Sequence, residues 1–378
     1  MNERKQFTIK RIDPLGQGVA LDDEKVTFIP KTLPGEVVEA TILSKKGKNV
    51  QFAKLEKVIT PSEQRTPSPC PHYTECQGCS FLHTDYQSEV LNKKSAYSFL
   101  FKKYKSPDDI SYHLAASRFQ YRNRIQLHYE IKGRSEKLGF MNQKGIHPIS
   151  TCLLPNPIIQ EKLKRIIEDG SWKHLAPTDA PSGHFELSKK GEEVDLYFNR
   201  PYADGGFSQV NQPMAKLARD LIQDKIKALT TQNTLLIDLF GGKGFLTKGL
   251  KNSTVVIDFG ARPDWKNSKE KFYVDQNLFK KKAIQKLKNS LASFLSKSEE
   301  RVLILDPPRS GCKNIKEFID FLKPQYIIYL SCNPSTQVRD IYELCHTKEW
   351  EVEDINFFDF FPATHHLESL VFLKRNKP

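Results

Sequence analysis

Three short motifs near the C-terminus carry the side chains best suited to covalent chemistry. They are Asp306–Pro308, Ser331–Pro334 and His366–Ser369. Cys332 supplies a nucleophilic sulfur, and Glu368 supplies a carboxylate base. A thiol and a carboxylate at one pocket rim suit a reaction in which an unreactive ring carbon is attacked, alkylated and then deprotonated. These motifs therefore predict alkylation of a pyrimidine at C5.

Each motif also has a simpler interpretation that the sequence leaves open. A free cysteine is commonly buried and inert, and a charged residue that opens an edge strand, as Glu368 would, is usually only solvated. Asp306 could belong to a stiff exit from a strand, because paired prolines hold a loop extended. We favour the functional interpretation because Asp306 and Cys332 follow predicted strands, whose carboxyl ends bind ligands in open α/β sheets. His365 and His366 could also act as bases, and we rank them below Glu368.

The elements that would position these residues form a predicted parallel sheet. Its strands are continuous apolar runs at residues 235–240, 254–258, 302–306 and 326–331, separated by helical segments. Continuous apolar strands are typical of a sheet that is covered on both faces. A helix before the first strand would bury one face, formed by Met214, Leu217, Leu221 and Ile222. The C-terminal part is therefore predicted to be a doubly wound, Rossmann-like α/β domain.

The loop after the first of these strands, Gly241–Gly244, is predicted to approach a cofactor. Phe240 ends the strand, and glycines such as Gly242 let the backbone come close to a ligand, while Asp258 could accept hydrogen bonds from ribose hydroxyls. The loop lacks the glycine spacing of a dinucleotide site and the Gly-Lys-Ser/Thr of a phosphate-binding loop, which favours S-adenosylmethionine. A glycine turn that only packs strand on helix is the alternative.

A second group of residues, all cysteines, predicts a metal site. Seven cysteines are too unevenly spaced for a disulfide framework, which favours a reducing compartment. Converging thiolates suit an iron–sulfur cluster or zinc, and spacing alone does not choose between them. Because the last of them comes much later in the chain, the middle of the chain must fold back onto the others. The four predicted ligands are Cys70, Cys76, Cys79 and Cys152.

We predict three domains in this chain. Residues 1–58 alternate short β-rich runs with glycine turns, which is typical of a small closed β-barrel. Residues 59–205 combine a basic amphipathic helix at 82–104 with later strand-like alternation, and form an α+β central domain that carries the cysteines. Residues 206–378 form the Rossmann-like domain. Lysines at a hairpin tip of the barrel, Lys45, Lys46 and Lys48, could contact phosphates or simply face water.

The charge balance favours a polyanionic partner. The chain of 378 residues holds 58 Lys and Arg against 45 Asp and Glu, a formal net charge of +13. Such an excess favours nucleic acid, although a diffuse excess also occurs in proteins that bind none. No apolar run is long enough to span a membrane, and the N-terminus is charged. We therefore expect a soluble, cytoplasmic protein without a membrane partner, and a monomer.

The motifs resemble, in order, those of the RNA uracil-C5 methyltransferases, and the likeness covers nearly the whole chain. The first domain resembles a TRAM domain, which binds RNA. The four cysteines resemble the set that holds a [4Fe-4S] cluster in this family. The segments that carry the resemblance in the last domain are Phe207–Asn211, Asp306–Arg309, Ser331–Pro334 with Arg339–Asp340, and Phe361–Pro362 through Glu368–Ser369.

This resemblance implies a class I methyltransferase fold for the last domain and a role for each site residue. Cys332 would be the nucleophile and Glu368 the proton acceptor. The substrate would be a uridine of RNA, with 23S rRNA favoured and tRNA as the alternative, and the methyl donor would be S-adenosylmethionine. The cofactor and uracil pocket would be lined by Gln209, Phe240, Gly242, Asp258 and Asp306.

Two other kinds of protein stay open. A non-catalytic iron–sulfur protein that binds RNA would keep the barrel and the cysteines without turnover. An amino-methyltransferase would use Asp306–Pro308 for an exocyclic nitrogen, and it would have no use for Cys332 or Glu368.

Overall fold

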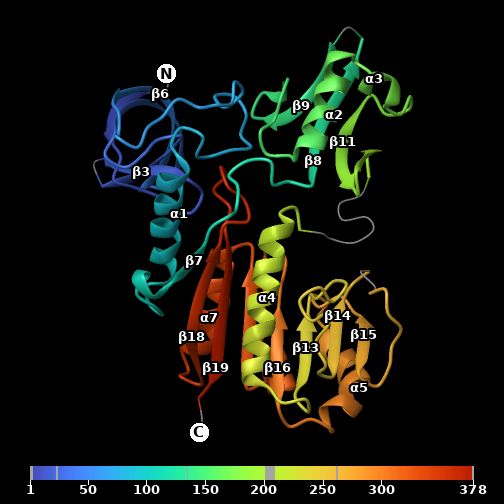
Figure 1. Ribbon diagram of the computed structural model, residues 1–378. Coiled ribbons are helices and arrows are strands. Elements are labelled where there is room, and N and C mark those ends of the chain that lie inside the picture. The colour runs from blue at the N-terminus through green and yellow to red at the C-terminus, as the bar shows by residue number, and fades with distance from the viewer. Residues whose placement is uncertain (1–2, 23, 134, 201–208, 261–262, 377–378) are drawn as a thin grey trace.

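The computed structural model describes residues 3–22, 24–133, 135–200, 209–260 and 263–376 and arranges them around three β-sheets (Figure 1). The two smaller sheets lie toward one end of a larger C-terminal sheet (Figure 1). Within these ranges, no helix combines the length and apolar character that a membrane span requires.

The N-terminal sheet has six strands in the order β1-β5-β6-β4-β3-β2. They are β1 (Arg4–Thr8), β2 (Arg11–Ile12), β3 (Gln17–Asp22), β4 (Lys25–Pro30), β5 (Val37–Lys46) and β6 (Val50–Thr60). The edge strands β1 and β2 follow each other in the chain, so one short segment lies along both edges of a curled sheet. The prediction of a closed barrel is met only in part, because no ladder joins β1 to β2 in the described chain. The predicted lysine hairpin tip lies between β5 and β6.

The central sheet is antiparallel, with the order β10-β9-β8-β11-β12. Its strands are β8 (Arg124–Lys132), β9 (Ser135–Asn142), β10 (Gly145–Pro148), β11 (Ser182–Lys190) and β12 (Glu193–Phe198). Alternate residues of β8, namely Ile125, Leu127 and Tyr129, are buried, as a strand with one covered face requires. The helix α2 (Pro157–Glu168) covers that face, and α3 (Trp172–Leu175) packs beside it.

The C-terminal sheet has eight strands in the order β15-β14-β13-β16-β17-β19-β18-β7. The first five are parallel, as the apolar runs predict: β13 (Leu235–Leu239), β14 (Thr254–Asp258), β15 (Lys271–Asp275), β16 (Arg301–Leu305) and β17 (Tyr326–Ser331). The strand β19 (Glu368–Arg375) is antiparallel to both β17 and β18 (Trp350–Phe358). The expectation that Glu368 opens an edge strand is therefore wrong, because β19 is hydrogen-bonded on both sides.

Helices cover both faces of this sheet. The helix α4 (Gln212–Leu229) lies on one face. The helices on the other face include α5 (Ala283–Leu295), α6 (Ile315–Leu322) and α7 (Pro334–Cys345). The buried side chains of α4 recur every four residues at Met214, Ala218, Ile222 and Ile226. The expectation that Leu217 shares this face is wrong, since its side chain is 41% exposed.

A segment predicted to belong to the central domain packs instead on the C-terminal sheet. The helix α1 (Tyr86–Phe101) begins at Asp85, whose carboxylate accepts a hydrogen bond from the Ser88 N–H. After a short 3-10 turn (Pro107–Asp109), β7 (Ser111–His113) pairs with β18. The prediction that α1 is amphipathic is wrong, because the buried side of this helix is not apolar and includes charged residues such as Glu89 and Lys93.

Substitution of Phe101 tests whether α1 is part of the C-terminal core. Phe101 is fully buried, and its ring centroid lies 5.5 Å from that of Phe357 in β18. We expect Phe101→Ala to lower the free energy of unfolding by about 3–5 kcal/mol, because it leaves a cavity. Urea denaturation monitored by circular dichroism measures this loss. Phe99→Ala, on the same helix but 53% exposed, is the control and should cost about 0.5 kcal/mol. Equal losses would contradict the packing of α1.

Candidate active site

Cys332 and Glu368 are brought together by the pairing of β17 with β19. In that antiparallel ladder Ser331 lies opposite Ser369. The next position along the same register puts Cys332, just after β17, opposite Glu368 at the start of β19. Asp306 follows β16, which pairs with the other side of β17. Three neighbouring strands therefore deliver a thiol and two carboxyl groups to one end of the sheet, as the sequence predicts for these residues.

The electrostatic environment of the site disfavours negative charge. Burial raises the pKa of Cys332 to about 11, and the nearby carboxyl groups of Glu368 and Asp306 add to this shift while Arg309 opposes it. Burial and the nearby Asp306 also raise the pKa of Glu368 well above its ordinary value. Asp306 itself is shifted to a pKa of about 7, by burial and by Asp258. Cys332, predicted from the sequence to be the nucleophile, is thus a neutral thiol in the resting site near pH 7.

Glu368 is the better placed of the predicted bases. Its side chain is 3% exposed, and its Oε2 atom has no hydrogen-bond partner in the described chain. Burial, with the positive charges of Arg309 and Lys93 nearby, lowers the pKa of His365 to about 4 and that of His366 to about 3. Such imidazoles bind a proton only weakly at neutral pH, which supports ranking them below Glu368.

The glycine loop after β13 is held by Asp258. The Gly242 N–H donates to Asp258 Oδ2 at 2.7 Å, and the Phe259 N–H donates to Oδ1 at 2.6 Å. Phe240 and Gly242 both have positive φ angles, of 61° and 55°. At Gly241 a side chain is excluded, because an added Cβ would lie 2.5 Å from the carboxyl carbon of Asp238. The carboxylate of Asp258, predicted to bind ribose, thus also orders the loop.

Asp238 is a site residue that the sequence analysis missed. It is fully buried within β13, its Oδ2 accepts a 3.3 Å hydrogen bond from the Thr247 hydroxyl, and its Oδ1 has no partner in the described chain. Burial, with Asp306 nearby, raises its pKa to about 8. The available signal was a carboxylate in the middle of an otherwise apolar strand, which is costly to bury unless a ligand uses it.

Gln209 provides a third unpaired polar atom, after those of Glu368 and Asp238. Its Oε1 is buried without a partner in the described chain, and its backbone oxygen accepts bonds from the side-chain amides of Asn123 and Gln212. Phe207 and Ser208, from the same motif, lie outside the described residues. The orphaned oxygens of Gln209 and Asp238 are acceptors for the amino and hydroxyl groups of a ligand, so these residues fit S-adenosylmethionine.

The four predicted metal ligands line one small cavity. Cys70, Cys76, Cys79 and Cys152 surround about 50 Å³, together with apolar side chains and Arg122. Burial raises the pKa of Cys76, Cys79 and Cys152, and the other cysteines nearby raise each of them further. Three such thiols, with the sulfur of Cys70 in the same cavity, fit a cationic iron–sulfur core, which would supply each sulfur with an iron. In the described chain, no three His, Cys, Asp or Glu side chains are arranged to hold a single metal ion.

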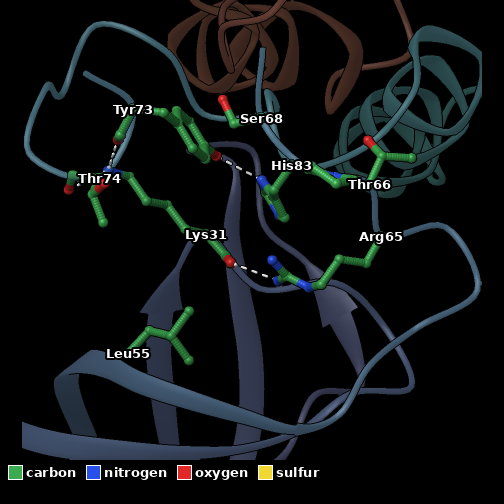
Figure 2. Close-up of a pocket in the computed structure, with 9 residues that line it drawn as sticks. Lys31, Leu55, Arg65, Thr66, Ser68, Tyr73, Thr74 and His83 are labelled. Carbon is green, nitrogen blue, oxygen red and sulfur yellow. Dashed lines mark hydrogen bonds between the residues drawn. The ribbon is translucent and has the colours of Figure 1, made fainter. Parts of the chain in front are cut away.

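The cysteine loop is tied to the N-terminal sheet. The Lys31 ammonium donates to the backbone oxygens of Tyr73 and Thr74, and it lies 4.7 Å from the centre of the Tyr73 ring (Figure 2). These residues border a hollow of about 430 Å³ that also includes Arg65 and His83. Arg65 is itself paired with Glu36. Both cations, Lys31 and Arg65, are thus already bound by other groups of the protein. None of the predicted site residues lines this hollow.

Comparisons with known proteins match this chain along nearly its whole length. A family model described as tRNA (Uracil-5-)-methyltransferase matches residues 267–376. The chain is 26% identical to the 23S rRNA (uracil(1939)-C(5))-methyltransferase RlmD of Shewanella sp. (strain MR-4), over 100% of this chain and 97% of that protein. It is 27% identical to the protein of the same name from Legionella pneumophila (strain Corby), over 95% of each.

One solved structure shares the fold. It is the Pyrococcus abyssi tRNA (uracil-54, C5)-methyltransferase in complex with S-adenosyl-L-homocysteine, with a TM-score of 0.64 and 18% identity. The match covers 97% of this chain and 99% of that chain.

Alkylation of Cys332 tests the electrostatics of the site. Because the thiolate is the reacting form, we expect alkylation by iodoacetamide to be slow at about pH 8 and to rise steeply toward the pKa of about 11. Glu368→Gln removes one of the carboxyl groups that raise the pKa of Cys332, so this pKa should fall and alkylation at about pH 8 should rise about tenfold for each unit of that fall. Peptide mass spectrometry measures the rate at Cys332. Glu349→Gln, at an exposed position, is the control; an unchanged rate in Glu368→Gln would refute this account.

Proposed function

Because the chain belongs to the RNA uracil-C5 methyltransferase family, we propose that it methylates C5 of a uridine in 23S rRNA through a covalent adduct of Cys332. The observation that carries this proposal is that Cys332, directly after β17, lies opposite Glu368 at the start of β19, with Asp306 directly after the next strand, β16. Ribosomal RNA is favoured over tRNA because two full-length relatives are named for 23S rRNA.

The mechanism assigns one step to each side chain. Cys332 loses its proton to solvent, and its sulfur bonds to C6 of the uracil, so that the electron pair of the C5–C6 double bond becomes available at C5. S-adenosylmethionine supplies the methyl group that C5 takes up. Glu368 then accepts the proton of C5, the double bond forms again, and the bond from C6 to sulfur breaks. Asp306, with a pKa of about 7, is a hydrogen-bond donor to the uracil when protonated.

Because Cys332 is half-buried, its sulfur can reach C6 only of a base that has left its stack. Uridines in loops are the least costly to extrude, because they lack paired partners. We assign the contact with the surrounding RNA to the N-terminal sheet, which resembles a TRAM domain, and to its exposed hairpin tip at Lys45, Lys46 and Lys48. The net charge of +13 supports a polyanionic substrate.

We propose that the four cysteines hold a [4Fe-4S] cluster through Cys70, Cys76, Cys79 and Cys152. Their common cavity supports this assignment, and a full set of four ligands leaves no open iron position, which fits a structural role. Seven free cysteines fit a reducing compartment, so we place the protein in the cytoplasm.

Methyl transfer to defined RNAs tests the proposed function. We expect radiolabelled methyl groups from S-adenosylmethionine to appear at C5 of uridine in 23S rRNA transcripts and not in tRNA. Cys332→Ala should abolish both methylation and the covalent enzyme–RNA adduct, because the sulfur makes the bond. Glu368→Gln should trap a methylated adduct that resists denaturing electrophoresis. Cys345→Ala, away from the site, should behave as the unchanged chain. Methylation of tRNA instead would reassign the substrate, and full methylation by Cys332→Ala would refute the mechanism.

Metal analysis tests the cluster. We expect the protein purified without oxygen to contain about four irons and four inorganic sulfides per chain, since that is the composition of the cluster. Cys79→Ser should lose most of both, while Cys312→Ser, whose sulfur lies in the C-terminal core, should keep them. Zinc in place of iron, or equal iron in both variants, would contradict the assignment.

A further inference from the structure

The segment that leads into Glu368, residues 359–367, is fastened along its backbone. It joins β18 to β19 and reaches toward the two smaller sheets (Figure 1). Phe358 pairs with Glu368, so the two ends of the segment lie side by side. The backbone oxygens of residues 360–363 and 365 accept hydrogen bonds. The donors, in this order, are the side chains of Asn211, Lys93 and Tyr121, the backbone of Ser80 and Phe81, and the side chain of Tyr97.

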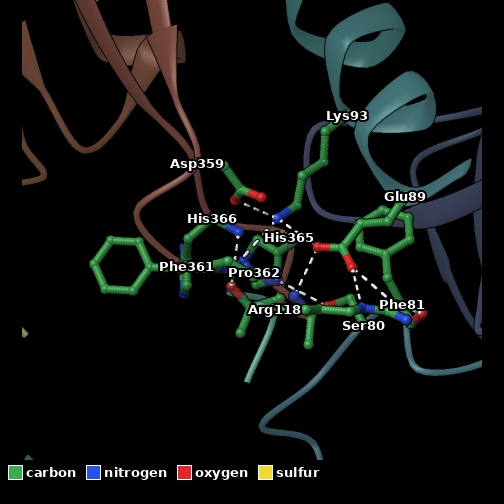
Figure 3. Close-up of polar contacts among 12 residues, drawn as sticks. Ser80, Phe81, Glu89, Lys93, Arg118, Asp359, Phe361, Pro362, His365 and His366 are labelled. Carbon is green, nitrogen blue, oxygen red and sulfur yellow. Dashed lines mark hydrogen bonds and ion pairs between the residues drawn. The ribbon is translucent and has the colours of Figure 1, made fainter. Parts of the chain in front are cut away.

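Lys93 makes three of the polar contacts around this segment. Its ammonium lies 2.9 Å from Asp359 Oδ1, 2.9 Å from Glu89 Oε1 and 3.2 Å from the backbone oxygen of Phe361 (Figure 3). The side chain is completely buried, as are those of Glu89 and Asp359. Burial alone would lower the pKa of Lys93, but the two carboxylates raise it above its ordinary value. The ammonium is therefore charged, and it holds the first and third residues of the segment.

Glu89 also binds the backbone of this segment. Its Oε1 accepts a 2.6 Å hydrogen bond from the Ala363 N–H, and its Oε2 pairs with Arg118 at 2.9 Å. Arg118 in turn donates to the backbone oxygen of Phe81 at 2.7 Å, and the Phe81 N–H donates to Ala363 O at 3.0 Å. Figure 3 shows Glu89 between Lys93 and Arg118, with Phe81 beside them. Two cations balance two carboxylates, so removing any one of them leaves a buried charge unpaired.

The backbone of the segment needs such support. Ala363 has a φ angle of +67°, in the left-handed region that residues with a side chain rarely adopt. A conformation of this kind costs about 1–3 kcal/mol and persists only where surrounding contacts hold it. Here both the N–H and the oxygen of Ala363 are bonded to residues outside the segment.

We propose that Lys93 is a positioning residue for Glu368 in the step that removes the C5 proton. This inference rests on the proposed function. Lys93 fixes the backbone conformation of residues 359–367 and thereby orients the carboxylate of Glu368, which follows them. Cys332 follows β17, which lies outside these ion pairs. Removing the ion pairs of Lys93 therefore slows proton removal from C5 more than it slows formation of the covalent adduct.

The test compares substitutions by the fate of the adduct. In Lys93→Met, which keeps a long apolar side chain and removes the charge, we expect turnover to fall at least about tenfold while a methylated enzyme–RNA adduct accumulates. The Michaelis constants for RNA and for S-adenosylmethionine should change less than about threefold. Lys94→Met, the neighbouring and partly exposed position on α1, is the matched control and should show normal turnover without adduct.

A charge-balanced variant keeps the test decisive if Lys93→Met alone does not fold. Lys93→Met combined with Asp359→Asn removes one charge of each sign but still lacks the bond to Phe361, so it should fold and accumulate adduct. Normal turnover, or equal loss of adduct formation and release in a folded variant, would overturn the inference. Glu368→Gln is run beside it. Absence of adduct in Glu368→Gln would overturn the proposed function and the inference with it, whereas adduct in Glu368→Gln but not in the Lys93 variants would overturn the inference alone.

Discussion

The insertion of β19 between β17 and β18 is the constraint on which the site depends. A parallel strand in this place would present its carboxyl end beside Cys332, and Glu368 would lie at the far end of the sheet. Because β19 runs antiparallel, its first residue, Glu368, arrives beside the residue that follows β17. Ladder pairing fixes this register, since a shift of one residue would move every side chain of a strand to the opposite face.

The same placement has an electrostatic cost. Asp238, Glu368 and Asp306 share one end of the sheet, and burial raises the pKa of each, with Asp306 adding to the shift of the other two. Buried carboxyl groups without partners destabilise a fold unless they stay protonated or meet a ligand. The unpaired oxygens of Asp238 and Glu368 mark the positions where a bound substrate or cofactor can supply the missing hydrogen bonds.

The smaller sheets are coupled to this site through backbone contacts. Ser80 and Phe81, directly after Cys79, donate to Ala363 O, and Ala363 also packs in one apolar cluster with Cys70, Cys79 and Cys152. The middle of the cysteine loop is bound by Lys31, which directly follows β4 of the N-terminal sheet. The cysteine loop therefore lies between the segment that precedes Glu368 and the N-terminal sheet, so its order bears on the geometry of the C-terminal site.

Much of the architecture is determined by the sequence alone. The apolar runs predict the parallel strands β13, β14, β16 and β17 within one or two residues, because a strand covered on both faces must be apolar throughout. The motifs around Asp306, Cys332 and Glu368 could be assigned because each combines a reactive side chain with the end of a strand. The four cysteines could be grouped by their rarity. These are local signals, which do not depend on the path of the remaining chain.

Only the tertiary structure decided the rest. That β19 is internal, that one oxygen of Asp238 lacks a partner in the described chain, and that Lys93 holds the segment before Glu368 all depend on contacts between residues far apart in the chain. A pattern of apolar and polar positions predicts that a lysine such as Lys93 is exposed. It is buried here because Glu89 on the same helix and Asp359 in a loop compensate its charge, and only folding brings that loop to the helix. Burial likewise sets the protonation of Cys332, since a thiol of ordinary pKa becomes a poor acid only when water is replaced by carboxyl groups and apolar side chains.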